Sequence, residues 1–168
     1  MNERFQPNIF RIHSYPYRVF YADTDAGGVV YYAQYLRMFE QVRALYVEEY
    51  GISLTAMVEQ DCQFVCRRAE IDYHSPALLD DRLDIDIWIC DQGRSYLTFA
   101  YEIFRLHHKN GHGGYPRLVT ATTQMVCCRK KNDRVAPRRI PNWIMKNLEK
   151  EPISRNETNF LTRTPDSD

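Results

Sequence analysis

The chain has 168 residues and no formal net charge at neutral pH, and 44% of its residues are hydrophobic. This length and composition predict one globular domain that is large enough to bury a core. A balanced charge gives no long-range attraction toward nucleic acid or a membrane surface, so we expect neither partner. The first 20 residues are interrupted by polar side chains, and no stretch approaches about 18 consecutive apolar residues. We therefore expect neither a secretory signal nor a membrane span.

The five cysteines are an odd number, and two of them, Cys127 and Cys128, are adjacent. Adjacent side chains of a strand point to opposite faces, so these two do not suit one metal ion. A zinc site needs C-x-x-C pairs or nearby Cys and His ligands. We expect reduced structural thiols in a cytoplasmic protein that has no metal and no cofactor.

The predicted elements begin after an irregular lead-in over residues 1–13. Residues 17–22 alternate as a first strand does, and a loop follows. Residues 32–50 then place apolar side chains at helical spacing, and Gly51 is a natural stop. This pattern predicts a helix of roughly five turns, on the order of 27 Å long. A short second helix is expected over residues 53–58.

Beyond Cys62 the hydrophobic period changes to two, which predicts strands. We expect four long strands in hairpin succession, over residues 62–74, 82–91, 95–108 and 118–129. Asn-Gly and Gly-Gly pairs within residues 107–116 are typical of a hairpin connection. A short helix is expected over residues 142–150, before a polar tail over residues 151–168.

These elements predict the α+β class, in which one mainly antiparallel sheet curves around a single long helix. Residues 14–150 would form that single domain. Such a layer leaves one edge strand and one apolar face uncovered, so we expect a homodimer.

An acidic loop, Tyr21-Ala-Asp-Thr-Asp-Ala-Gly-Gly-Val-Val-Tyr31, lies just before the long helix. Unpaired N–H groups at a helix N-terminus can stabilise negative charge that develops beside a reacting carboxylate. Paired glycines also let a ligand come close to the backbone. The simpler alternative is that Thr24 or Asp25 only caps the helix. For Asp23 we expect a structural role.

This loop, continued to Tyr35, resembles the signature of hot-dog-fold acyl-CoA thioesterases of the 4-hydroxybenzoyl-CoA thioesterase type, and most of all their Tol-Pal-associated branch. The likeness covers residues 15–145 and continues in further short motifs, at residues 64–68, 72–76, 79–81 and 138–141. The resemblance implies a hot-dog fold, in which a curved antiparallel sheet wraps a long helix. It also implies a homodimer or homotetramer that binds the acyl thioester between subunits.

The resemblance makes Asp25 the catalytic carboxylate and the backbone N–H of Tyr32 the group that polarises the thioester carbonyl. Many members of the branch carry histidine where this chain has Tyr32, so only the backbone donor carries over. Gly27, Gly28 and Val29 would bind the substrate beside these groups. Asp25 could attack the carbonyl carbon and form a mixed anhydride, or it could activate a water molecule.

Coenzyme A carries phosphates, which Arg and Lys suit. The candidate contacts are three basic clusters, namely Arg129 with Lys130 and Lys131, Arg138 with Arg139, and Arg67 with Arg68. Each cluster could equally be a solvated basic face. Two rival functions stay open: a hot-dog hydratase or dehydratase, which normally needs a histidine at the helix start, and a non-catalytic module that binds acyl-CoA or acyl carrier protein. The acyl chain and the choice between coenzyme A and acyl carrier protein also stay open.

Overall fold

The computed structural model describes residues 12–106, 116–131 and 134–150. The elements in chain order are β1 (His13–Arg18), the short 3-10 turn η1 (Tyr21–Asp23), α1 (Gln34–Glu49), α2 (Leu54–Glu59), β2 (Gln63–Tyr73), β3 (Arg82–Gln92), β4 (Tyr96–Leu106), β5 (Arg117–Lys131), β6 (Arg134–Pro137) and α3 (Asn142–Leu148). Within these residues the strands form one antiparallel sheet in the order β1-β3-β4-β5-β2, with β6 paired to β5. The predicted α+β class and the antiparallel sheet are confirmed.

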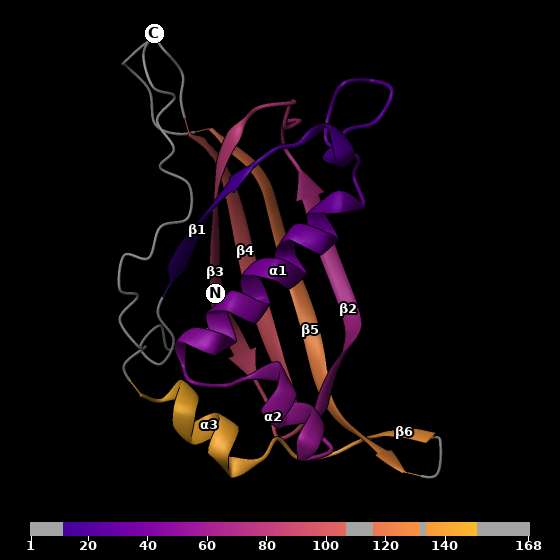
Figure 1. The fold of residues 1–168 in the computed structure, drawn as a ribbon, viewed down its shortest axis with the longest axis vertical. Coiled ribbons are helices and arrows are strands. Elements are labelled where there is room, and N and C mark those ends of the chain that lie inside the picture. The colour runs from indigo at the N-terminus through magenta and orange to yellow at the C-terminus, as the bar shows by residue number, and fades with distance from the viewer. Residues whose placement is uncertain (1–11, 107–115, 132–133, 151–168) are drawn as a thin grey trace, which may run out of the picture.

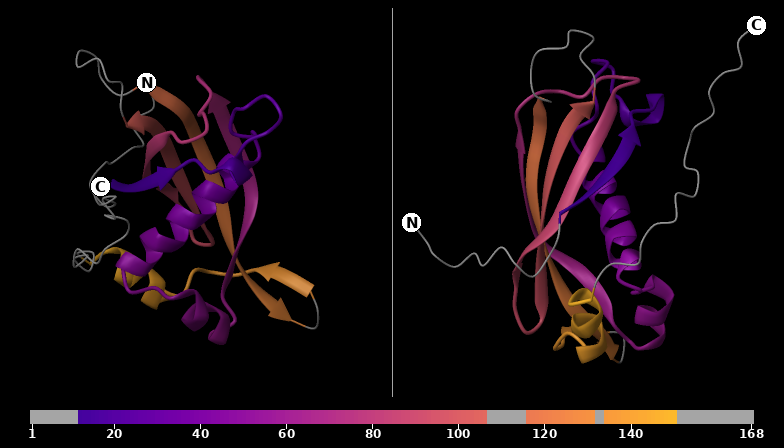
Figure 2. Two further views of the ribbon diagram at one scale, coloured as in Figure 1. Left: turned by 45° about the horizontal axis from the view of Figure 1, so that its top comes forward. Right: turned by 90° about the vertical axis from the view of Figure 1, so that its left-hand side faces the viewer.

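Helix α1 crosses one face of the curved sheet, as Figures 1 and 2 show. Its buried stripe, spaced at three and four residues, consists of Tyr35, Met38, Phe39, Val42 and Tyr46. Gly51 ends the helix with a positive φ of 71°, a conformation that glycine adopts without strain. The predicted long helix is therefore confirmed, although it begins at Gln34 and not at Tyr32.

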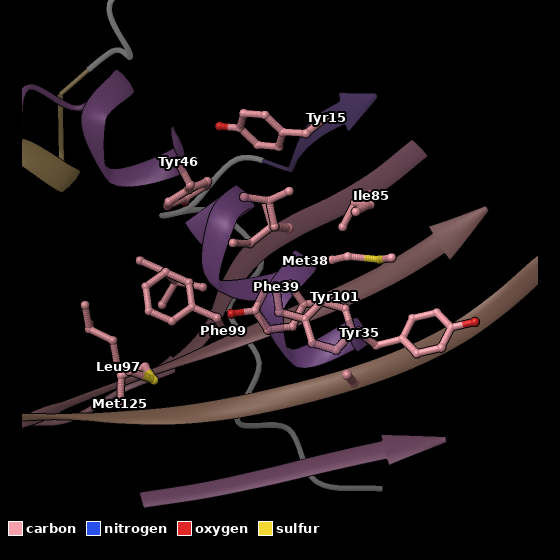
Figure 3. Close-up of a cluster of buried hydrophobic side chains, with 14 of the residues drawn as sticks. Tyr15, Tyr35, Met38, Phe39, Tyr46, Ile85, Leu97, Phe99, Tyr101 and Met125 are labelled. Atoms are coloured by element: carbon pink, nitrogen blue, oxygen red, sulfur yellow. The ribbon is translucent and has the colours of Figure 1, made fainter. Parts of the chain in front are cut away.

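The core lies between α1 and the central strands. The ring of Phe39 stacks on Tyr101 of β4 at a centroid distance of 4.3 Å, and Figure 3 shows α1 side chains facing β3, β4 and β5. Removing a buried Phe side chain typically costs about 3–5 kcal/mol, so this contact fixes the helix on the sheet. Strand β3 supplies the clearest predicted alternation, with Leu83, Ile85, Ile87 and Ile89 all buried.

The predicted hairpin succession is wrong for β2. This strand pairs with β5 at the sheet edge, while β3 pairs with β1 and β4. The segment between β2 and β3 must therefore cross the sheet. On the way its backbone binds the acidic loop, where the Val30 N–H donates to the Ala77 carbonyl at 2.8 Å.

Two further element predictions need correction. The first strand covers His13–Arg18 and not residues 17–22, because Val19 binds the backbone of Asp81 and the chain then enters η1. Strand β6 was not expected; it forms because β5 continues to Lys131 and the chain folds back on it. The second helix, the long strands and α3 are confirmed within two residues of the predicted ends. The predicted hairpin connection and polar tail lie outside the described residues.

Strand β2 is the least covered strand. Most of its side chains are exposed, and only Phe64 and Ile71 are half-buried, whereas β3 and β4 each bury one face. An edge strand with an open hydrogen-bonding side is a ready template for pairing with another strand. None of the helices in the described ranges is long and apolar enough to cross a membrane.

Candidate active site

The acidic loop folds as a tight turn over residues 25–29. The Asp25 N–H donates to the Val29 carbonyl at 3.0 Å, and the Gly28 N–H donates to the Asp25 carbonyl at 3.0 Å. Gly28 has φ of +73°, which explains why glycine follows glycine here. The turn places the Asp25 side chain at its first corner.

The Asp25 carboxylate is exposed, and its Oδ1 accepts the Gly27 N–H at 2.7 Å. This contact fixes one oxygen and leaves the other directed away from that bond. Neither Thr24 nor Asp25 caps the long helix, because the N-cap of α1 is Ala33 and no side chain bonds there. The capping alternative therefore fails, and the carboxylate stands free of any role in α1.

Asp23 differs from Asp25 both in burial and in its hydrogen bonds. Its side chain is buried, and its Oδ2 accepts the Tyr17 hydroxyl at 3.0 Å and the Phe20 N–H at 2.9 Å. Burial, followed by the hydrogen bond and charge of Asp23, raises the pKa of Tyr17 to about 12. The Asp23 carbonyl also accepts the Tyr31 N–H at 2.9 Å. The expected structural role is confirmed, although Asp23 braces η1 and not the long helix.

Tyr32 lies in the turn between the loop and α1. Its carbonyl accepts the Tyr73 hydroxyl at 3.0 Å, which ties the end of β2 to this turn. No acceptor among the described residues bonds the Tyr32 N–H. The adjacent Tyr31 ring lies 4.5 Å from the Tyr32 ring, and the pKa of Tyr31 is raised, first by the Tyr32 hydroxyl and last by the Asp25 charge. The Asp25 charge is the smallest of the causes that raise the pKa of Tyr31.

Comparison with known proteins fits this arrangement. A sequence model of the thioesterase-like superfamily matches residues 19–148, which covers most of the chain and lies within the predicted single domain. The chain belongs to this superfamily. It is also similar to the protein named acyl-CoA thioester hydrolase YbgC of Escherichia coli, at 38% identity over 89 residues, which is 53% of this chain and 66% of that protein. The match thus spans slightly less than two thirds of that relative.

Solved structures of two proteins named as thioesterases share the fold. A 1,4-dihydroxy-2-naphthoyl-CoA thioesterase from Synechocystis is 26% identical and aligns with a TM-score of 0.70, over 82% of this chain and 96% of that chain. The 4-hydroxybenzoyl-CoA thioesterase of a Pseudomonas strain aligns with a TM-score of 0.71 at 19% identity, over 82% and 99% of the two chains. The hot-dog fold implied by the sequence resemblance is therefore confirmed.

The predicted substrate residues of this thioesterase-like protein fall into two groups. Gly27, Gly28 and Val29 lie in the turn beside Asp25, and a Cβ added at Gly27 would lie 3.0 Å from the Asp25 Oδ1. Val29 also forms an antiparallel bridge with Leu78. The loop therefore has little free space on the Gly27 side of the carboxylate.

The basic clusters are not brought to the acidic loop within one chain. Arg67 lies at a β-bulge of β2, and the neighbouring Arg68 pairs with Glu70 on the exposed face. Arg129–Lys131 lie where β5 pairs with β6, at the end of the sheet opposite the loop before α1, as Figure 1 shows. Their predicted contact with coenzyme A phosphates stays a prediction.

Sequence reasoning missed three side chains that hold this site together. Tyr73 bonds the Tyr32 carbonyl, and Asp81 and Arg105 form an ion pair beside the loop. In the sequence, Tyr73 and Asp81 appeared only as members of the short family motifs at residues 72–76 and 79–81. Arg105 gave no signal, because its partner lies 24 positions away in the sequence.

The described parts of the chain contain no group of three or more His, Cys, Asp or Glu side chains that could hold a metal ion.

Proposed function

We propose that the protein hydrolyses acyl-CoA thioesters, with Asp25 as the nucleophile or general base. One observation carries the proposal: an exposed carboxylate, steadied by the Gly27 amide, stands beside a helix-entry turn whose Tyr32 N–H has no partner among the described residues. The superfamily match and the activity named for the E. coli relative support the same chemistry.

The arrangement can perform either form of the reaction. In the nucleophilic form, an Asp25 oxygen bonds to the carbonyl carbon, the carbon–sulfur bond breaks, and the thiolate leaves; water then cleaves the mixed anhydride. In the general-base form, a water oxygen attacks while its proton passes to Asp25, and the departing sulfur takes up a proton. Either route puts negative charge on the carbonyl oxygen, where the Tyr32 N–H would stabilise it.

A second copy of the chain completes the proposed site. Large apolar side chains are exposed around the loop and on the neighbouring elements, namely Tyr21, Tyr32, Leu36, Tyr73 and Leu78. Together with the uncovered β2, they support a homodimer, or a homotetramer built from it, that covers the acyl chain between subunits. The odd number of cysteines and the five free thiols support a reducing cytoplasmic setting.

A panel of acyl thioesters tests the proposal. It contains short, branched and long aliphatic acyl-CoAs, one aromatic acyl-CoA, one enoyl-CoA and one acyl carrier protein thioester. Release of free thiol, read with a chromogenic disulfide, is the expected result. Loss of enoyl absorbance without thiol release would instead indicate a hydratase, and saturable binding without either change would indicate a binding module.

The phosphate contacts need a separate measurement. Neutralising Arg129 and Lys130 in one variant, and Arg67 and Arg68 in another, should raise the Michaelis constant for acyl-CoA only where the cluster contacts phosphates. Adenosine bisphosphate should compete with the substrate in the wild type, and it should compete less well in a variant whose Michaelis constant has risen. An unchanged Michaelis constant in both variants would remove both clusters from the binding site.

A further inference from the structure

The acidic loop does not hold its shape alone, because the segment over residues 76–81 lies against it. The Val30 N–H donates to the Ala77 carbonyl at 2.8 Å, and Val29 pairs with Leu78 in an antiparallel bridge. Val29 in turn accepts the Asp25 N–H. Only two steps of backbone contact therefore separate this segment from the Asp25 backbone.

One ion pair fixes both ends of that segment. The Arg105 Nε donates to the Asp81 Oδ2 at 2.8 Å, and the same carboxylate oxygen accepts the Leu78 N–H at 2.7 Å. The Arg105 Nη2 also donates to the Pro76 carbonyl at 2.6 Å. The two side chains are only 16% and 17% exposed, so solvent screens them weakly. Arg105 lies near the end of β4, a strand that is paired on both sides, so the segment is tied to the middle of the sheet and not to an edge.

A half-buried ion pair is weak evidence for stability, because desolvation offsets much of the attraction. Its geometry points to a different role here. Arg105 uses two donors in a fixed fork, which a lysine cannot reproduce. The fork spans the segment that binds Val29 and Val30.

We propose that Asp81 and Arg105 are positioning residues that set the acidic loop, and so place the Asp25 carboxylate for thioester hydrolysis. This inference rests on the proposed function for its kinetic consequence, but its structural consequence is independent of it. Neither side chain touches the reacting atoms; both act through the Ala77 and Leu78 backbone.

The chain supplies a matched control in the same turn. Arg18 and Asp80 form another ion pair, at 2.9 Å, but their side chains are 56% and 67% exposed. Asp80 has φ of +66°, which asparagine tolerates, so Asp80→Asn removes the charge without new backbone strain. Arg105→Lys and Asp80→Asn thus each perturb one ion pair beside the same segment.

The test combines kinetics with hydrogen exchange on the full chain. For the acyl-CoA that the wild type hydrolyses fastest, Arg105→Lys should lower kcat by about 10- to 100-fold with a Michaelis constant within about two-fold, as expected for a misplaced reacting group. Amide exchange of residues 25–30, read by mass spectrometry, should speed up in Arg105→Lys. Asp80→Asn should match the wild type in both measurements.

Unchanged kcat in a folded Arg105→Lys protein, or unchanged exchange of residues 25–30, would overturn the inference. If Arg105→Lys does not fold, Asp81→Asn decides by the same two measurements, because it keeps an oxygen acceptor and removes only the charge. A wild type that hydrolyses no thioester would defeat the proposed function, while the exchange measurement would still decide whether the ion pair holds the loop.

Discussion

Substitutions of Asp25 and Asp23 should have opposite effects: the first should lower kcat, and the second should lower the free energy of unfolding. Asp25 is exposed and accepts one bond, from the Gly27 N–H, which the side-chain oxygen of asparagine can also accept. Asp25→Asn should therefore change the free energy of unfolding by less than about 0.5 kcal/mol. If Asp25 is the base or nucleophile, the same change should lower kcat by about 10²- to 10⁴-fold, the range typical of a lost general base.

Asp23→Ala should give the opposite result. It leaves the Tyr17 hydroxyl and the Phe20 N–H, whose bonds to the buried Asp23 carboxylate are both partly buried, without their shared acceptor. Each unsatisfied donor costs about 1–3 kcal/mol, so the variant should lose roughly 3 kcal/mol of stability. For a domain of this size that corresponds to a fall in Tm of about 6–12 °C. Activity per folded molecule should stay well above that of Asp25→Asn.

The assay measures thiol release at saturating substrate and urea unfolding for each variant, and Asp72→Asn, an exposed change on β2, is the control. The control should stay within about two-fold of the wild-type kcat. The reasoning would be refuted by Asp25→Asn retaining more than about a tenth of wild-type kcat. It would also be refuted by a stable Asp23→Ala protein whose activity falls as far as that of Asp25→Asn.

Three other changes probe the same loop. Gly27→Ala places a methyl group 3.0 Å from the Asp25 Oδ1, so, if Asp25 is the base or nucleophile, kcat should fall about ten-fold with little change in urea stability; unchanged kcat would contradict this. Tyr17→Phe should be less stable than the wild type at pH 8. The difference in free energy of unfolding between the two proteins, measured with urea, should narrow by roughly 1 kcal/mol by pH 11. The reason is that the raised pKa of Tyr17 makes the unfolded chain lose this proton first as the pH rises above 10, and a constant gap would refute it. Tyr73→Phe removes the bond to the Tyr32 carbonyl and should lower kcat several-fold while the Michaelis constant stays unchanged. A several-fold rise in the Michaelis constant would indicate a binding role instead.

The fold was predictable where one pattern dominated. Helix α1 and strand β3 each bury a single stripe, at helical and strand spacing respectively, so local sequence was sufficient. Strand β1 was misplaced because Val19 and Phe20 continue its alternation but bind other partners, namely the Asp81 backbone and the Asp23 carboxylate. The position of β2 was missed because strand order depends on contacts between distant segments, which periodicity does not contain.

The candidate site, like the fold, was predictable only where a local sequence motif marked it. The motif around Asp25 identified the loop, and Gly28 adopts the positive φ that a glycine pair permits. The parts that hold the loop could not be read locally, because each is a pairing between distant residues. Arg105 comes from β4, and Tyr73 comes from the far end of β2. Arginine and tyrosine are both common on strands, and only the folded structure shows which groups these two side chains contact.

The positions of the basic clusters are relevant to how many chains contribute residues to one proposed active site. In one chain, Arg129–Lys131 lie at the end of the sheet opposite the acidic loop, while β2 offers an open edge along its length. If two copies pair antiparallel through β2, the end of one sheet that bears β6 comes toward the other copy's acidic loop, because antiparallel pairing reverses the two chains. A cluster remote from Asp25 in its own chain can then contact the phosphates of a thioester held by the partner. Neutralising the cluster in one chain and replacing Asp25 in the other would then give a mixed dimer with one intact site, whereas placing both changes in the same chain would leave none.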